Sequence, residues 1–496
     1  MTDPVIPLVI RGKIIRDNLK SYTTRGGKQT FHSPDMTKYI DQLVLTDPCD
    51  QQDLYDLTLD EIVDYLVELG NRLTLEDNSH LRQALDMSLG TSSFSDEMLR
   101  FQFGLIPQIL SRQAIEHQIE SSIGAAYLKG WVKESAGGRD YAVRAFGARA
   151  VHVIAGNGWV IALQTLIVNA ITRSDAIIKI PSNDLYFCLA VVATMIEMAP
   201  DHPITKHVSV AYWKGGDAAV EKPLYKPLNL EKIVAWGGFA SMESIRNYLG
   251  PGLDLVALDP KSSASIIGSE AFTSDETMAQ AAELAARDIG YLNQAGCINA
   301  RTLYIQTGTD DRGIQRANAF GRAVFEAMQN LPANLSSAHP SFDPTLREEI
   351  EGVRHSGTFR VFGGRSAEGA IIVSQYPESV DFSDRLDCRV ANLVPVDEID
   401  EAIARLTVHT QTIGIFPDPL KAQIRDKCAL RGGQRMTSLG TATVGGFGGP
   451  QDGIEPVRRM VRWIRDDTAA TEGHVGPFGA TSMDAGPAVA APAHVE

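Results

Sequence analysis

The residue best placed for covalent chemistry is a cysteine that follows a short loop containing glycine. Cys297 closes the segment NQAGC (293–297), which comes directly after a stretch of helical pattern, Thr277–Tyr291. A thiol attacks carbonyl carbons as its thiolate, and a thiolate needs partial exposure and a positive or dipolar environment. Taken alone, the segment fits a buried structural cysteine better than a nucleophile, because free cysteines are among the most buried residues.

An amide side chain follows the first strand expected after residue 143. Asn157 stands in the string AGNG (155–158), directly after Gly156. Open α/β sheets bind ligands beyond the carboxyl ends of their strands, and an amide there can donate a hydrogen bond to a developing oxyanion. By itself the string is also explained as a plain Asn-Gly turn.

Three further segments could bind phosphate or ribose groups. Lys179 and Ser182 belong to KIPS (179–182), which closes the second expected strand. Glycines let the backbone approach a pyrophosphate near a helix N-terminus. Two glycine pairs follow later strands, Gly215-Gly216 and Gly237-Gly238. Neither pair completes Gly-x-Gly-x-x-Gly, so the usual dinucleotide fingerprint is absent.

Length and composition bound the remaining possibilities. A chain of 496 residues predicts at least two domains. Lys plus Arg number 46 against 61 Asp plus Glu, and without a basic run this excludes nucleic acid and anionic membranes as main partners. Five separated cysteines, with no CxxC and no nearby histidines, indicate a reduced protein and no metal site. No signal peptide and no long apolar stretch is found, so we expect a cytoplasmic protein without a membrane span.

The pattern of elements predicts an α/β protein. The N-terminal part reads as mainly helical, with a strand pair in Val5–Ile15, a helix in Leu57–Leu73 capped by Thr58 and Glu61, and helix across Asp96–Glu120. From residue 143, strands alternate with helices, which predicts right-handed crossovers and a parallel sheet. The expected strands are Val143–Gly156, Asp175–Pro181, His207–Tyr212, Glu231–Trp236 and Asp254–Asp259, with helices at Trp159–Ile171 and Leu185–Met198 and from Met242.

A second α/β block follows Cys297. Its expected strands are Thr302–Gln306, Thr358–Phe362, Ala370–Ser374 and Val390–Val396, with helices at Asp311–Met328 and Glu398–Leu406. We therefore divide the chain into a mainly helical region (1–140), a cofactor domain (141–265, with parts of 1–140), a catalytic domain (266–440), a C-terminal return segment (441–466) and a disordered tail rich in Ala, Gly and Pro (467–496).

The order of these features resembles the aldehyde dehydrogenase superfamily. There, an Asn after one strand and a Lys-Pro-Ser after the next frame the cofactor, and the nucleophilic cysteine opens the second domain. ALDPKS (257–262) resembles the superfamily's Glu-Leu-Gly-Gly-Lys-Ser, with Ala257 in place of the general-base Glu. That Glu activates the water that hydrolyses the thioester, so its absence implies an acyl-cysteine that survives to be reduced or transferred.

Within the superfamily, the sequence most resembles the LuxC-type acyl-CoA reductases, over roughly residues 100–465. The stretches KIPSND (179–184), NQAGC (293–297) and GPQDGIEPVRRMVRW (449–463) carry the resemblance. It implies an aldehyde dehydrogenase-like fold with Cys297 as the nucleophile, and Asn157 and the amide of Cys297 as oxyanion donors. It assigns the nicotinamide cofactor to Gly156, Lys179, Ser182, Gly215, Gly216, Gly237 and Gly238.

Departures from the pattern bear on the cofactor. Met242 holds the place of a second turn glycine, Arg385 falls near that of a ribose-binding Glu, and Arg301 stands where a Gln often follows the nucleophile. In NAD-selective relatives a Glu shortly after the Lys clasps both ribose hydroxyls and repels a 2′-phosphate. Ser182-Asn183-Asp184 lacks that Glu, so NADPH is favoured and NADH remains the alternative.

The resemblance implies reduction of an acyl-CoA or acyl-protein thioester, with a fatty acyl group, to the aldehyde. An acyl-protein synthetase is a possible partner, and homo-oligomers are expected. Two alternatives stay open: a CoA-acylating aldehyde dehydrogenase acting oxidatively, and a non-catalytic acyl carrier or scaffold. An acyl-phosphate reductase ranks last, because nothing suggests a second phosphate pocket. His152 and His409 lie near the right segments for acid or base catalysis, although structural roles explain them more simply.

Overall fold

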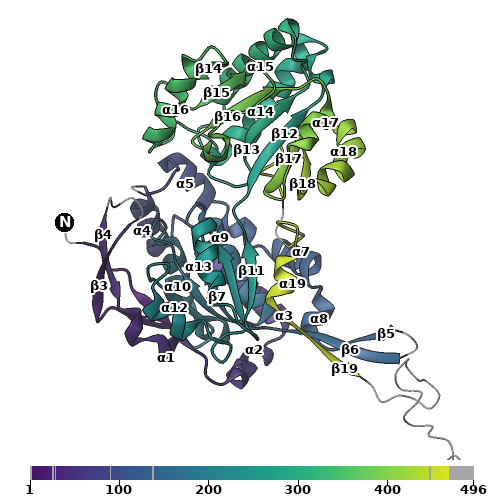
Figure 1. The fold of residues 1–496 in the computed structure, drawn as a ribbon. Helices are drawn as coiled ribbons and strands as arrows, with labels where there is room; N and C mark the ends of the chain where they lie inside the picture. Colours follow the sequence, from purple (N-terminus) through teal and green to yellow (C-terminus); the bar gives the residue numbers. More distant parts are fainter. Residues whose placement is uncertain are drawn as a thin grey trace, which may run out of the picture.

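Two seven-stranded sheets, each covered by helices, form the body of the protein, and a narrow three-stranded sheet projects from it (Figure 1). The computed structural model describes residues 3–24, 27, 29–89, 91–136, 139–445 and 448–467. The architecture confirms the predicted α/β class. Among the helices of these ranges, none is both long and apolar enough to cross a membrane.

The first sheet has the strand order β11-β10-β7-β8-β9-β1-β2. Its parallel part, as predicted, consists of β7 (Arg149–Val153), β8 (Asp175–Lys179), β9 (Val208–Ala211), β10 (Lys232–Trp236) and β11 (Asp254–Leu258). The expected N-terminal strand pair, β1 (Leu8–Ile10) and β2 (Lys13–Ile15), extends one edge antiparallel. Sheets buried on both faces favour such short apolar strands.

Helices cover both faces of this sheet. The apolar sides of α9 (Trp159–Thr172), α10 (Phe187–Met198) and α3 (Leu59–Arg72) pack on one face. On the other face lie α12 (Ala218–Leu224) and α13 (Phe239–Arg246). The predicted capping box of α3 is confirmed: the Thr58 hydroxyl accepts from the Glu61 amide at 3.2 Å, and the Glu61 carboxylate accepts from the Thr58 amide at 2.7 Å.

The N-terminal region is built mostly from short helices. The continuous helix predicted across Asp96–Glu120 is wrong, because Gly104 and Pro107 interrupt it and Ser111 caps a new start. The elements are β3 (Leu19–Thr23), β4 (Thr30–Pro34), η1 (Met36–Lys38), α1 (Ile40–Leu43), η2 (Pro48–Gln51), α2 (Gln52–Tyr55), α4 (Ser79–Ser88), α5 (Asp96–Phe103), α6 (Ile106–Ile109), α7 (Arg112–Ser122), α8 (Ala125–Lys129) and, between α10 and β9, α11 (Pro203–Lys206).

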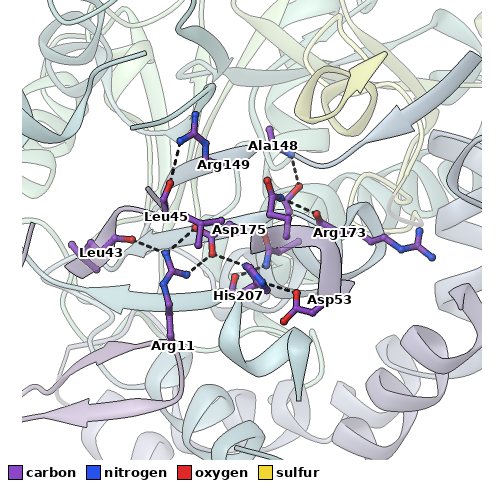
Figure 2. A network of polar contacts seen from close by, with 12 residues as sticks. Arg11, Leu43, Leu45, Asp53, Ala148, Arg149, Arg173, Asp175 and His207 are labelled. Carbon is purple, nitrogen blue, oxygen red and sulfur yellow. Dashed lines mark hydrogen bonds and ion pairs between the residues drawn. The ribbon is translucent and has the colours of Figure 1, made fainter. Parts of the chain in front are cut away.

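A buried polar network fastens this region to the sheet at the end opposite the predicted site (Figure 2). Asp175, the first residue of β8, accepts from the Arg11 guanidinium at 2.5 and 3.2 Å. The two ring nitrogens of His207 each lie 2.9 Å from a carboxylate oxygen, one of Asp175 and one of Asp53. His207, directly before β9, thus links the carboxylate of Asp175 in β8 to that of Asp53 in α2.

The second sheet has the order β14-β15-β16-β13-β12-β17-β18, and β14 alone among them runs antiparallel to its neighbour. Its strands are β12 (Ser262–Ile267), β13 (Ala300–Ile305), β14 (Phe359–Gly363), β15 (Ala370–Ser374), β16 (Val390–Pro395), β17 (Thr410–Phe416) and β18 (Arg435–Ser438). The covering elements are η3 (Ser269–Phe272), α14 (Asp275–Gly290), η4 (Tyr291–Gln294), α15 (Asp311–Gln329), α16 (Pro344–Arg354), η5 (Ser383–Arg385), α17 (Ile399–Ala404) and α18 (Asp418–Leu430).

The projecting sheet corrects one predicted strand. Val143–Gly156 was expected to be continuous, but it divides between β6 (Arg139–Phe146) and β7. The chain bends at Gly147, where a Cβ atom would lie 2.0 Å from the Arg173 carbonyl oxygen. β6 pairs with β5 (Val132–Ala136) and with β19 (Arg462–Asp467), which follows α19 (Pro456–Met460). Of the predicted tail, Asp467 ends β19, and residues 468–496 lie outside the described residues.

Candidate active site

Four neighbouring parallel strands end at one edge of the first sheet, and each is followed by a segment singled out from the sequence. In sheet order these strands are β10, β7, β8 and β9. The segments are Gly237-Gly238 after β10, Gly156-Asn157 after β7, Lys179 at the end of β8 with Ser182 beyond it, and Gly215-Gly216 after β9. The structure thus brings the predicted cofactor residues to one edge.

The glycines at this edge serve two different purposes. A Cβ atom added to Gly215 or Gly238 would have no heavy atom within 4 Å, so the backbone there borders open space. Gly216 has φ +80°, a conformation that favours glycine. Gly156, by contrast, makes room for a neighbour, since its Cβ would lie 2.1 Å from the Asn183 side-chain oxygen.

A buried charged pair lies beside the open space. Burial lowers the pKa of Lys179 to about 8, and the Glu221 charge opposes that shift. The Lys179 amine lies 5.7 Å from the Trp213 ring centroid. Glu221 Oε1 accepts from the Trp213 indole and the Gly216 amide at 3.2 and 3.1 Å, whereas its Oε2 is buried with no partner in the described residues. A cation, an unpaired acceptor and open glycine backbone fit the ribose and phosphates of a dinucleotide.

The loop before Cys297 has an unusual backbone. Leu292, Asn293 and Gln294 have φ values of 55°, 50° and 63°, in the left-handed region that non-glycine residues adopt at a cost of about 1 kcal/mol or more each. Buried hydrogen bonds hold this turn. The Gln294 amide donates to the carbonyls of Ala300 and Val390 at 2.8 and 2.9 Å and accepts from the Val390 amide at 2.9 Å.

The cysteines differ in their surroundings. Burial raises the pKa of Cys388 to about 12 and that of Cys428 to about 11, and Cys188 is buried as well. Cys297 is half-buried. Burial and the Asp452 carboxylate raise the pKa of Cys297, while a hydrogen bond from Gln411, the Arg301 charge and a backbone amide lower it. The pKa of Cys297 is thus raised overall, and the Gln411, Arg301 and backbone groups offset only part of the rise that burial causes.

Arg301 forms hydrogen bonds to the backbone around the loop that carries Cys297. Its guanidinium donates to the carbonyl oxygens of Gly296, Asn299 and Leu386 at 3.3, 3.1 and 2.8 Å. The Ser263 hydroxyl donates to the Cys297 carbonyl at 2.6 Å from β12. These bonds fix the loop backbone and leave a positive charge near the thiol.

Asn157 reaches the same loop from the first sheet. Its side-chain amide donates to the Ala295 carbonyl at 3.0 Å, across 138 positions of sequence. An Asn amide carries two N–H groups, so one of them remains for a ligand. The two predicted catalytic residues therefore lie at one site, between the two sheets.

Two residues of the site were not predicted from the sequence. Gln411 donates to the Asp452 carboxylate at 2.5 Å and also bonds the Cys297 thiol. Gln411 lies on β17, which the sequence did not predict. Asp452 lies in GPQDGIEPVRRMVRW (449–463), a stretch that carries the family resemblance but suggests no chemical role for its residues. Asp452 is the one carboxylate that precedes Gly453 in that stretch, and this is the sequence signal that could have pointed to it. In the structure its φ is 53°.

Cavities lie close to this site, and the smaller one borders α9. One, of about 240 Å³, is lined by Ile298, Gln411 and Asp452 among others. A second, of about 70 Å³, is lined mainly by apolar side chains of α9 and α19. Gly448, Gly449 and Gln451 line both, so the two spaces adjoin.

The structure also shows where the two candidate histidines and the residues that depart from the family pattern lie. Burial lowers the pKa of His152 in β7 to about 4, so its ring is neutral at pH 7 and is not the imidazolium that a histidine general acid requires. His409 is exposed and contacts Phe239, with ring centroids 5.6 Å apart. Arg385 pairs with Glu349 at 2.5 Å. Ala257 lies on β11 and brings no carboxylate to the site.

Comparison with known proteins agrees with this geometry. The acyl-CoA reductase (LuxC) family matches residues 54–463. The chain belongs to this family. A relative from Vibrio harveyi, named a long-chain acyl-protein thioester reductase, is 24% identical over 488 residues, 97% of this chain and 95% of the relative. A Photorhabdus laumondii relative of the same name is 26% identical over 417 residues, 82% of each chain.

Solved structures show the same fold. A Mycobacterium tuberculosis aldehyde dehydrogenase complexed with NAD⁺ superposes with a TM-score of 0.68 at 14% identity, over 95% of this chain and 99% of that one. The aldehyde dehydrogenase-like fold expected from the sequence is thereby confirmed. This LuxC-family chain is accordingly an oxidoreductase of the acyl-CoA reductase type.

Proposed function

We propose that this enzyme reduces a fatty acyl thioester to the aldehyde through an acyl group carried on Cys297, with NADPH as reductant. The observation that carries the proposal is the contact of Asn157 with the Cys297 loop at the edge where Lys179 and the glycine pairs end. The names of the relatives support an acyl-protein thioester as substrate, and acyl-CoA is the soluble equivalent.

Acylation follows from the residues around the thiol. The Cys297 thiolate attacks the thioester carbonyl, and the charge of Arg301 favours that thiolate. The free N–H of Asn157 and the backbone amide of Cys297 stabilise the oxyanion. The leaving thiol departs, and the acyl group remains on Cys297.

The chain then protects the acyl group from water. Ala257 offers a methyl group where a carboxylate would activate a water molecule, so the thioester persists. A bound nicotinamide cofactor would supply a hydride to the acyl carbon, and the bond from that carbon to the Cys297 sulfur would then break to release the aldehyde and return the thiolate. Lys179, Ser182 and the glycine pairs would hold the cofactor, and Gly156 supports them by seating Asn183. Residues 182–184 lack the Glu that repels a 2′-phosphate in NAD-selective relatives, which favours NADPH over NADH.

Assembly and partners belong to the same proposal. The projecting sheet β5-β6-β19 stands clear of the body (Figure 1), and we propose that it contributes to a homo-oligomer. An acyl-protein synthetase that delivers the acyl thioester is the partner we expect.

The test is a steady-state comparison with purified full-length protein. Decanoyl-CoA with NADPH should give decanal, with a kcat/KM above that with NADH. Faster turnover of decanal, CoA and NADP⁺ would instead assign the oxidative, CoA-acylating direction. No turnover in either direction, with acyl-protein substrates also inert, would leave an acyl carrier or scaffold and overturn the proposal.

A further inference from the structure

The smaller cavity has a polar wall in otherwise apolar surroundings. Val160, Ile161 and Val168 line it from α9, and Val457 and Met460 line it from α19. The polar side chains in the same wall are Gln118, His152, Gln164, Thr165 and Gln451. Three of them, Gln118, His152 and Gln164, are 4%, 3% and 8% exposed.

Two of these side chains leave hydrogen-bonding capacity unused. Gln118 donates to the Gln164 carbonyl oxygen at 2.9 Å, but the Gln164 amide nitrogen is buried with no partner among the described residues. The ring of His152 also makes no hydrogen bond to any residue that the structure describes. A buried unpaired amide costs about 1–3 kcal/mol, so native structures usually provide a partner for it.

The geometry points to a ligand that brings a polar group to this depth. We propose that the cavity receives the acyl chain of the substrate and that the Gln118–Gln164 pair selects chains carrying a hydroxyl part-way along. This inference rests on the proposed function, because it assumes an acyl group on Cys297. A hydroxyl both donates and accepts, so it satisfies the pair in either orientation of the two amides.

The polar group lies part-way along the cavity wall. Ile161, Gln164, Thr165 and Val168 share one face of α9 at the spacing of successive turns. A chain that runs along this face therefore meets the Gln164 amide between the apolar side chains of Ile161 and Val168.

The experiment measures acylation of Cys297 by intact-protein mass spectrometry, without cofactor. The substrates are decanoyl-CoA and its monohydroxylated forms, with the hydroxyl placed in turn at successive carbons along the chain. We expect one hydroxylated form to acylate the wild type about tenfold faster than decanoyl-CoA, the usual scale for pairing a buried polar group. Equal rates would mean that solvent satisfies Gln164, and would overturn the inference while leaving the proposed function intact.

Variants separate selection from general damage. The double variant Gln118→Met/Gln164→Met removes both amides at similar volume, so the preference for the hydroxylated chain should disappear while decanoyl-CoA still reacts. Gln102→Met is the matched control, because Gln102 also has a buried unpaired amide nitrogen but does not line this cavity. Retention of the preference in the double variant would overturn the inference. Failure of every chain to acylate Cys297 would overturn the proposed function, and this inference with it.

Discussion

Replacing Asn157 by Ala should separate catalysis from loop positioning. Among the described residues the Asn157 amide makes one hydrogen bond, at 3.0 Å to the Ala295 carbonyl, in an exposed setting. Losing that bond should cost about 1 kcal/mol of stability or less. The loss of an oxyanion donor should slow acylation of Cys297 by about 100- to 1000-fold, because this donor acts where charge develops.

The assay compares two reactions of the same thiol. Acylation by decanoyl-CoA passes through an oxyanion, whereas alkylation by iodoacetamide does not. Asn157→Ala should therefore depress acylation and leave alkylation within about threefold of the wild type, since only acylation uses the donor. Asn183→Ala is the control, because the Asn183 amide donates to the Gly156 carbonyl at 2.9 Å and supports the same turn through a bond that does not go to the Cys297 loop. A parallel fall of both rates in Asn157→Ala would refute the oxyanion role.

Three further predictions concern stability. Gln294→Ala removes three bonds to backbone groups and should cost about 2–4 kcal/mol in urea unfolding, with slower acylation of Cys297; an unchanged midpoint would contradict this. Because the pKa of His152 falls from 6.5 to about 4 on folding, its stabilising contribution is present above pH 6.5 and lost towards pH 4. His152→Leu should therefore remove about 3 kcal/mol from the fall in the free energy of unfolding over that range. An unfolding free energy with the same pH profile as the wild type would count against this. Asp175→Asn should lower the free energy of unfolding by about 3 kcal/mol, whereas the surface change Asp96→Asn should lower it by about 0.5 kcal/mol or less.

The sequence predicts most of the first sheet because its strands carry their own signal. Runs such as DAIIKIP (175–181) are apolar and bounded by turn residues, and they alternate with helices of suitable length. Parallel strands place their carboxyl ends at one edge, so the order of Asn157, Lys179 and the glycine pairs was enough to predict that they lie together.

Three strands of the second sheet, β12, β17 and β18, are harder to predict because they lack that signal. β12 reads SSASII, with serines among the apolar residues, and β17 contains Gly414. That glycine has a long-range reason: its Cβ would lie 2.5 Å from the Asp288 carboxylate, which accepts from the Gly440 and Ala442 amides at 2.9 Å each. No local pattern contains such a contact.

The same limit applies to the site. Contact between Gln411 and Asp452 depends on a strand and a loop that meet only in the folded chain. The left-handed turn at Leu292–Gln294 follows from buried partners supplied by Val390 and Ala300, not from the residue types themselves. Sequence patterns therefore single out Cys297 as the candidate nucleophile but not Gln411 and Asp452, which lie beside it.

Mapping the acyl group on the protein tests the central claim most directly. Labelled decanoyl-CoA is added to the full-length enzyme without cofactor, and the labelled peptide is identified by mass spectrometry. The account predicts label on Cys297, stable to water and discharged as aldehyde when NADPH is added. Label on Cys49, Cys188, Cys388 or Cys428 with Cys297 unmodified, or release of the free acid instead of aldehyde, would contradict it.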